Sequence, residues 1–317
     1  MSCDNQLSHR LSAPHVIAKP RIEAEFGKNA GQYDALAKVQ RTIADHLIDS
    51  MIIPLKDKLK DSKKLRILDA GCGTGYLASR LQASLQPLLQ QKSLQMHQGI
   101  DIGQLEITAF DLSKEMLEVA MAKGCYDRSL QGDIEMLSMM RDSLVDPIVD
   151  PIAPYDFVMS SLAVQWCHHF ETALTALQSI ANVAQKYVGR EDEAHQRPNV
   201  YITTLLKGTL QELEKAFERV DNETHILRFE TKSDVVSIVE RLGGRIEVYE
   251  EIMIFDSLRA LFQSLKGIGA TNVPNRRKGL LGKNDYQKLD EYFKSLGRYQ
   301  LTYVVAEITL PGTYQRE

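Results

Sequence analysis

Residues 67–75 read Ile67-Leu68-Asp69-Ala70-Gly71-Cys72-Gly73-Thr74-Gly75. The apolar run at residues 65–69 is typical of a buried strand, and residues 76–81 open with helical spacing. Glycine lets the backbone turn sharply between two such elements and approach a bound ligand closely. This segment therefore predicts a strand, a tight turn and a helix that together form a site for a nucleotide-like cofactor.

Outward from this motif, predicted helices and strands alternate along the chain. Further strands are expected at residues 105–110, just before Asp133, at 155–161, 199–205, 246–255 and 303–308. One or two helices are expected over 34–59, and one each at 210–220 and 234–242. This alternation predicts an α/β fold, in which a doubly wound, mostly parallel seven-stranded Rossmann-like sheet carries helical cap elements. Two polar insertions, at 85–104 and 187–198, are expected to be surface loops.

The domain organisation follows from the same pattern. We predict a flexible N-terminal tail over residues 1–25 and a single domain over residues 26–317. Within that domain, cap and substrate-binding elements are expected at about residues 26–50, 206–232 and 256–298.

Composition excludes several classes of function. The chain has 317 residues, a formal net charge of -4 and a pI near 6.1, so no general positive field attracts nucleic acid or an anionic membrane. Cysteines at positions 3, 72, 125 and 167 form no CxxC pair and no zinc spacing. The sequence shows no signal peptide and no apolar run of the ~20 residues that a membrane span needs. We predict a cytoplasmic monomer without nucleic-acid or membrane partners; a mitochondrial address on Arg10, Lys19 and Arg21 is the alternative.

Acidic residues follow successive predicted strands. Asp111 ends the second strand, where a carboxylate can accept both hydroxyls of a ribose, and Asp133 follows the third, where an adenine amino group needs an acceptor. Asp111 stands 42 residues after Asp69, against a usual interval of ~20, and the insertion at 85–104 accounts for the excess. Each feature alone is often only a turn or a helix cap, but three in order favour a cofactor site.

The glycine spacing is G-x-G-x-G with Asp69 two residues before the first glycine, which favours S-adenosylmethionine over NAD. We therefore predict S-adenosylmethionine as the cofactor. Its predicted binding residues are Asp69, Gly71, Cys72, Gly73, Gly75, Asp111, Leu112, Met116, Asp133, Ile134, Ser160 and Ser161.

Other segments carry more distinctive residues. They are Phe26-Gly27-Lys28-x-Ala30-x-x-Tyr33, Gln40-Arg41, Ser161-Leu162-Ala163-Val164-Gln165-Trp166-Cys167, Thr203-Thr204-Leu205, Gly208-Thr209-Leu210-Gln211-Glu212-Leu213, His225-x-x-Arg228-Phe229, Leu265-Lys266-Gly267-Ile268-Gly269-Ala270-Thr271 and Gly297-Arg298-Tyr299-x-Leu301-Thr302-Tyr303. With the glycine motif they resemble the malonyl-acyl-carrier-protein O-methyltransferases of biotin synthesis, over about residues 26–308. The two insertions depart from that pattern but fall outside its motifs.

The resemblance implies transfer of a methyl group from S-adenosylmethionine to the free carboxylate of a malonyl thioester, carried by acyl-carrier protein or coenzyme A. A carboxylate with a pKa of ~4 is already ionised at pH 7, so no strong general base is required. The resemblance places Tyr33, Gln165 and Arg228 in catalysis, and Tyr33, Arg41, Trp166, Thr204, His225 and Arg228 in substrate binding. A basic docking patch for the acidic carrier protein is expected at Lys266, Arg276, Arg277 and Lys283.

Alternatives stay open at this point. Arg41 and Arg228 could instead form surface salt bridges, and Tyr33, Trp166 and His225 could serve packing alone. Adjacent His168 and His169 do not suit metal chelation, so no metal site is predicted. The chain could instead methylate another small molecule, act as a mitochondrial assembly factor, or bind S-adenosylmethionine as a non-catalytic scaffold, because a fold does not fix its substrate.

Overall fold

The computed structural model describes residues 17–61, 64–90, 105–143, 154–182, 198–221, 223, 225–266 and 282–313. All seven predicted strands are confirmed, and they form one sheet in the order β3-β2-β1-β4-β5-β7-β6. Strands β1 to β5 are parallel, while β7 runs antiparallel to both of its neighbours. The strands are β1 (Leu65–Ala70), β2 (Leu105–Asp111), β3 (Arg128–Gln131), β4 (Phe157–Ser161), β5 (Val200–Leu205), β6 (Arg245–Phe255) and β7 (Tyr299–Leu310). Most of the two predicted insertions lies outside the described residues.

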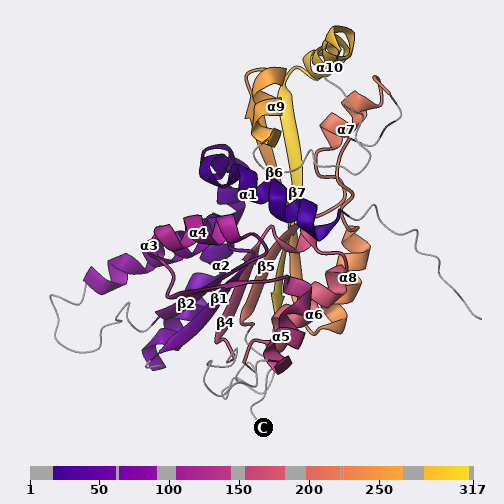
Figure 1. Cartoon of the computed structure of the whole chain (residues 1–317). Helices are drawn as coiled ribbons and strands as arrows, with labels where there is room; N and C mark the ends of the chain where they lie inside the picture. The colour runs from indigo at the N-terminus through magenta and orange to yellow at the C-terminus, as the bar shows by residue number, and fades with distance from the viewer. Residues whose placement is uncertain are drawn as a thin grey trace, which may run out of the picture.

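Helices cover both faces of this sheet (Figure 1). One face packs on α2 (Lys38–Asp61), α3 (Tyr76–Gln90) and α4 (Lys114–Ala122), and the other on α5 (Leu137–Ser143), α6 (Phe170–Ser179) and α8 (Lys232–Arg241). Strands β1, β2 and β4 are buried along nearly their whole length, as expected for parallel strands between two helical layers. Within the described part of the chain, no helix is both long and apolar enough to cross a bilayer.

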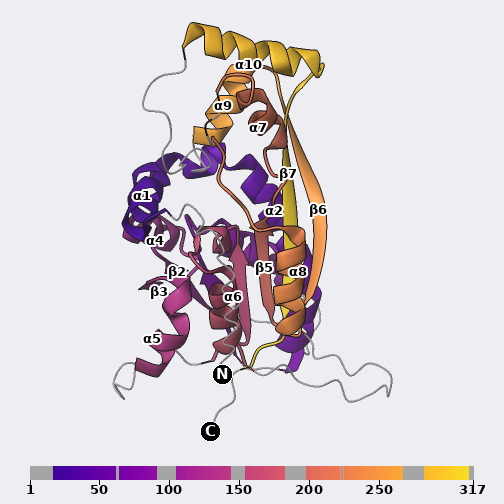
Figure 2. The same cartoon turned by 90° about the vertical axis from the view of Figure 1, so that its right-hand side faces the viewer.

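A cap rises from one edge of the sheet. Strands β6 and β7 extend beyond the others and carry α7 (Gln211–Phe217), α9 (Leu258–Lys266) and α10 (Lys283–Ser295) (Figure 2). The cap has its own apolar core, which Val39 and Ile43 of α2 join. Buried Glu212 fixes α7 to β7, because its carboxylate accepts hydrogen bonds from Thr302 N at 3.0 Å and from Gln300 Nε2 at 2.9 Å.

Helix α1 (Lys19–Leu36) crosses the molecule between the cap and the sheet (Figure 1). The tail predicted over residues 1–25 was therefore too long, since the helix already begins at Lys19. Pro20 suits the first turn of a helix, where its missing N–H costs nothing, and Ile22 is buried. One or two helices were predicted over residues 34–59, and the structure has the end of α1 and nearly all of α2 there, separated at Ala37.

Candidate functional site

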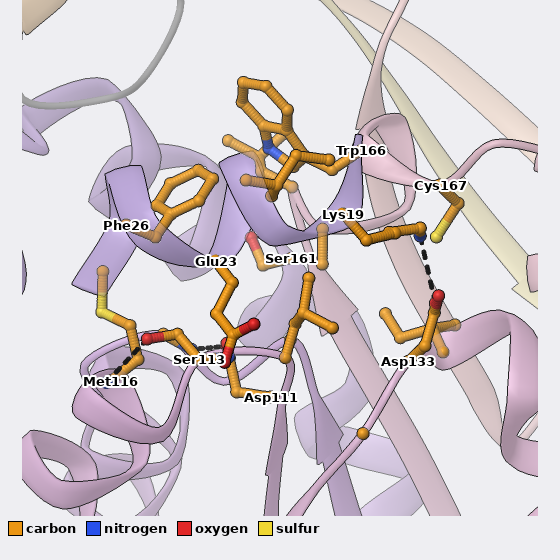
Figure 3. Close-up of a pocket in the computed structure, with 18 residues that line it drawn as sticks. Lys19, Glu23, Phe26, Asp111, Ser113, Met116, Asp133, Ser161, Trp166 and Cys167 are labelled. Carbon is orange, nitrogen blue, oxygen red and sulfur yellow. Dashed lines mark hydrogen bonds and ion pairs between the residues drawn. The ribbon is translucent and has the colours of Figure 1, made fainter. Parts of the chain in front are cut away.

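The sheet order reverses between β1 and β4, and the carboxyl ends of parallel strands at such a point form a natural crevice for a ligand. A pocket with an empty volume of about 710 Å³ lies there. Its walls come from residues 71–75, here called the glycine loop, from the loops after β2, β3 and β4, and from α1 (Figure 3). Of the residues predicted to bind the cofactor, eight line this pocket: Gly71, Gly73, Asp111, Leu112, Met116, Asp133, Ile134 and Ser161.

The glycine loop follows β1 directly. Gly71 has φ +73°, and a Cβ added there would lie 2.2 Å from Cβ of Ala163, so another residue would be both strained and in collision. Gly73 also has a positive φ, of +52°, and a Cβ there would meet nothing within 4 Å. Gly71 is thus required by packing against the loop after β4, whereas Gly73 leaves open space beside the pocket.

Asp111 holds this loop from the neighbouring strand. Its Oδ2 accepts the backbone N–H of Gly73 at 2.9 Å, and its Oδ1 accepts that of Ser113, also at 2.9 Å. Burial raises the pKa of Asp111, although these hydrogen bonds oppose the shift. Each carboxylate oxygen has a further lone pair, so Asp111 can still accept the hydroxyls of a ribose in the pocket.

Asp133 lies at the opposite end of the pocket, after β3. Its Oδ1 accepts the backbone N–H of Glu135 at 3.1 Å and the ammonium of Lys19, also at 3.1 Å. Lys19, Glu23 and Phe26 of α1 line the same pocket, although sequence reasoning gave them no role there. Pro20 followed by apolar residues at helical spacing was the available signal for this helix.

Four predicted cofactor residues, Asp69, Cys72, Gly75 and Ser160, do not line this pocket. Ser160 is buried and its Oγ donates to the carbonyl oxygen of Ala70 at 2.7 Å, so it joins β4 to β1 beneath the site. Gly75 packs against Tyr126 and Ala120, and a Cβ at this position would lie 2.9 Å from the tyrosine ring. Packing therefore accounts for a glycine here. Cys72 lines an adjoining cavity.

That adjoining cavity lies on the α2 side of the glycine loop and contains Asp69, Arg41 and Tyr76. Asp69 is 1% exposed, and Tyr126 donates a hydrogen bond from its hydroxyl to Asp69 Oδ2 at 2.6 Å. Burial raises the pKa of Asp69 to about 7, with Tyr126 opposing the shift and Asp111 adding to it. Asp69 is thus a carboxyl group whose charge changes near neutral pH.

We expect the affinity for S-adenosylmethionine to fall about tenfold between pH 8 and pH 6, measured by titration calorimetry. A cationic ligand favours ionised Asp69, and a group with a pKa of about 7 loses most of its charge over that range. Tyr126→Phe removes the hydrogen bond that lowers the pKa of Asp69, so the transition should move to higher pH. An affinity independent of pH in both proteins would show that Asp69 does not face the charge of the ligand.

Two further cavities lie toward the cap, and one of them shares part of its wall with the cofactor pocket. One contains Gln165, Trp166, Thr204 and Arg228, and Trp166 also lines the cofactor pocket. Thr204 donates to Gln165 Oε1 at 3.4 Å, which leaves the amide N–H groups of Gln165 for a ligand. These predicted substrate residues therefore come together.

His225 and Arg228 both line a larger cavity under α7. His225 Nε2 lies 2.7 Å from Asp221 Oδ1, and its ring stacks on Phe217 at 3.8 Å. Arg228 is exposed there. These contacts hold His225 between the end of α7 and the following loop, on the wall of the cavity.

The other predicted positions are only partly described. The side chains of Tyr33 in α1 and Lys266 in α9, and all of Arg276 and Arg277, lie outside the described residues. Lys283 is exposed as the first residue of α10.

Comparison with known proteins gives similarity over nearly the whole chain. The chain is 32% identical over 289 residues to a malonyl-[acyl-carrier protein] O-methyltransferase of Pectobacterium atrosepticum, which covers 90% of this chain and 93% of that protein. A protein of the same name from Erwinia pyrifoliae is 28% identical over 304 residues, 93% of this chain and 95% of that protein. Among solved structures, magnesium protoporphyrin IX methyltransferase of Synechocystis PCC 6803 aligns over 92% of this chain and 98% of its own, with 15% identity and a TM-score of 0.45. No protein-family model matches the chain.

Proposed function

The chain belongs to the malonyl-[acyl-carrier protein] O-methyltransferase family, and on this premise we propose that it transfers the methyl group of S-adenosylmethionine to the free carboxylate of a malonyl thioester. The cofactor is S-adenosylmethionine, and the product is the methyl ester, made at the start of biotin synthesis. The observation that carries the proposal is that Trp166 lines both the pocket at the glycine loop and the cavity with Gln165 and Arg228. A methyl donor in the first pocket and an acceptor in the second would therefore meet at this residue.

The chemistry makes few demands on proton transfer. A carboxylate of ordinary pKa is ionised at pH 7 and attacks the methyl carbon directly, so the carbon–oxygen bond forms as the carbon–sulfur bond breaks. The sulfonium cation and the carboxylate anion both become neutral. The principal task of the protein is then to align oxygen, carbon and sulfur, an effect worth up to ~7–11 kcal/mol.

In this arrangement Asp111 receives the ribose and Asp133 the adenine amino group. Gln165 and Thr204 face the acyl group, and Arg41 or Arg228 clamps the carboxylate with two parallel hydrogen bonds. Support comes from the cavities: Arg41 lies beside the glycine loop, and Arg228 beside Gln165 and Thr204. Tyr33 is expected to close over the cofactor, and His225 to steady the substrate.

The acyl group is carried by acyl-carrier protein, as the names of the relatives indicate. We propose that Lys266, Arg276, Arg277 and Lys283 receive this acidic partner, with effects mainly on the association rate. We also propose that the enzyme is a monomer. A reducing compartment such as the cytoplasm agrees with the free thiols of Cys72, Cys125 and Cys167.

The test is to incubate the purified chain with methyl-labelled S-adenosylmethionine and malonyl-acyl-carrier protein and to detect the methyl ester by mass. We expect the ester with malonyl-acyl-carrier protein, and less or none with the acetyl form, which lacks the free carboxylate. Malonyl-coenzyme A in a parallel reaction measures the contribution of the carrier. Cofactor binding without any ester would contradict this function and favour a different acceptor or a scaffold role.

A further inference from the structure

Lys19 is the first residue of α1, and its side chain reaches toward Asp133 on the wall of the cofactor pocket (Figure 3). Its ammonium lies 3.1 Å from Asp133 Oδ1 and 2.7 Å from Glu135 Oε2. The three side chains are 19%, 23% and 9% exposed, so water screens these ion pairs less than pairs on the open surface. One cation thus bridges two carboxylates that would otherwise repel each other.

Glu135 extends this link to the loop after β4. Its two carboxylate oxygens accept the backbone N–H groups of His168 at 2.9 Å and His169 at 2.8 Å, just after Trp166. Burial alone would raise the pKa of Glu135, but the hydrogen bonds from Lys19 and from these N–H groups outweigh it and lower the pKa. Lys19 therefore joins α1 to the ends of both β3 and β4.

Further contacts of α1, and of Ile17 just before it, also cross the pocket. Phe26 meets Trp166 edge to face, with ring centres 5.2 Å apart, and His168 Nε2 lies 3.0 Å from the carbonyl oxygen of Ile17. At Gly27 the helix passes so close to α4 that a Cβ would lie 2.6 Å from Glu115 Oε2. Helix α1 thus contacts the loops after β2, β3 and β4 and forms the roof of the pocket.

We propose that Lys19 is a positioning residue whose ion pairs with Asp133 and Glu135 hold α1 over the cofactor pocket, and that these pairs break each time cofactor enters or product leaves. Lys19 and the N–H of Glu135 both bind Oδ1 of Asp133, so in this proposal Oδ2 is the atom that accepts the adenine amino group. This inference rests on the proposed function only for the identity of the cofactor.

A metal ion is the competing occupant of this position. Ligand atoms of Asp133, Glu135 and Cys167 lie within 4.8 Å of one another, which would suit a cation. The Lys19 ammonium already contacts both carboxylates, and burial raises the pKa of the Cys167 thiol to about 12, which disfavours the thiolate that a metal requires. We therefore assign the position to Lys19.

The chain supplies its own probe, because Trp166 is its single tryptophan and contacts α1. In stopped-flow fluorescence with S-adenosylhomocysteine, Lys19→Met should increase the dissociation rate by about tenfold, as expected for loss of a charge-assisted hydrogen bond, and should also increase the association rate. Lys19→Arg keeps the cation and should restore slow dissociation. Arg21→Met removes an exposed cation from the same turn and should leave both rates unchanged.

Unchanged rates in Lys19→Met, or equal changes in Arg21→Met, would overturn the proposal. Circular dichroism and the unfolding midpoint establish that each variant is folded, and a generally loosened protein would not bind ligand faster. These measurements need no acyl substrate. Failure to form the malonyl ester with these kinetics intact would therefore overturn the proposed acceptor and leave the role of Lys19 standing.

Discussion

Asp111→Asn should weaken binding of S-adenosylmethionine and S-adenosylhomocysteine by about 100-fold, because two charge-assisted hydrogen bonds to the ribose are lost or weakened. The amide also brings its own N–H groups toward the N–H groups of Gly73 and Ser113, which the carboxylate now accepts at 2.9 Å. The glycine loop should then lose its anchor as well. Titration calorimetry with S-adenosylhomocysteine measures the effect.

Asp156→Asn is the matched control. Asp156 also accepts a backbone N–H from a neighbouring strand, that of Arg66 at 2.9 Å, but it lies at the amino end of β4, opposite the site. Both variants should lose stability, and only Asp111→Asn should lose cofactor. Equal affinities in the two variants would contradict the assignment of Asp111 to the ribose.

The sequence was sufficient where function depends on local geometry. The positive φ of Gly71 and the position of Asp111 at the end of β2 follow from neighbouring residues, since a strand, a sharp turn and a helix can be read from periodicity. Ser113, two residues after Asp111, is likewise a local feature: it caps α4, and its side chain accepts the N–H of Met116.

The sequence was insufficient where function depends on distant pairs. Lys19 and Asp133 are 114 residues apart, and nothing local to either indicates the ion pair. Ser160 and Ser161 were both predicted to bind the cofactor, but successive side chains of a strand point to opposite faces. Ser161 therefore lines the pocket, while Ser160 binds the carbonyl oxygen of Ala70. His225 stands in a predicted substrate motif, yet its contacts with Asp221 and Phe217 could not be foreseen without the packing of α7.

Replacement of the arginine that clamps the substrate carboxylate should lower kcat/KM for the malonyl thioester by about 100-fold, because a two-bond grip on an anion is lost. Arg228 shares a cavity with Gln165 and Trp166 but does not line the cofactor pocket. Arg228→Met should therefore leave S-adenosylhomocysteine affinity unchanged. Arg228→Lys should fall between, since an ammonium keeps the charge but not the planar fork.

Arg41→Met distinguishes the two candidates. Arg41 lies in the cavity of Asp69 and Gly71, so a role with the cofactor would reduce affinity and turnover together, whereas a role with the substrate would reduce turnover alone. Lys207→Met is the control, because Lys207 lines the cap cavity with Arg228 but not the cavity of Gln165. If Lys207→Met lowers kcat/KM as much as Arg228→Met, the effect is one of general positive charge in the cap. If only Arg228→Met does so, the acceptor carboxylate is held between Arg228 and Gln165, on the cap side of Trp166.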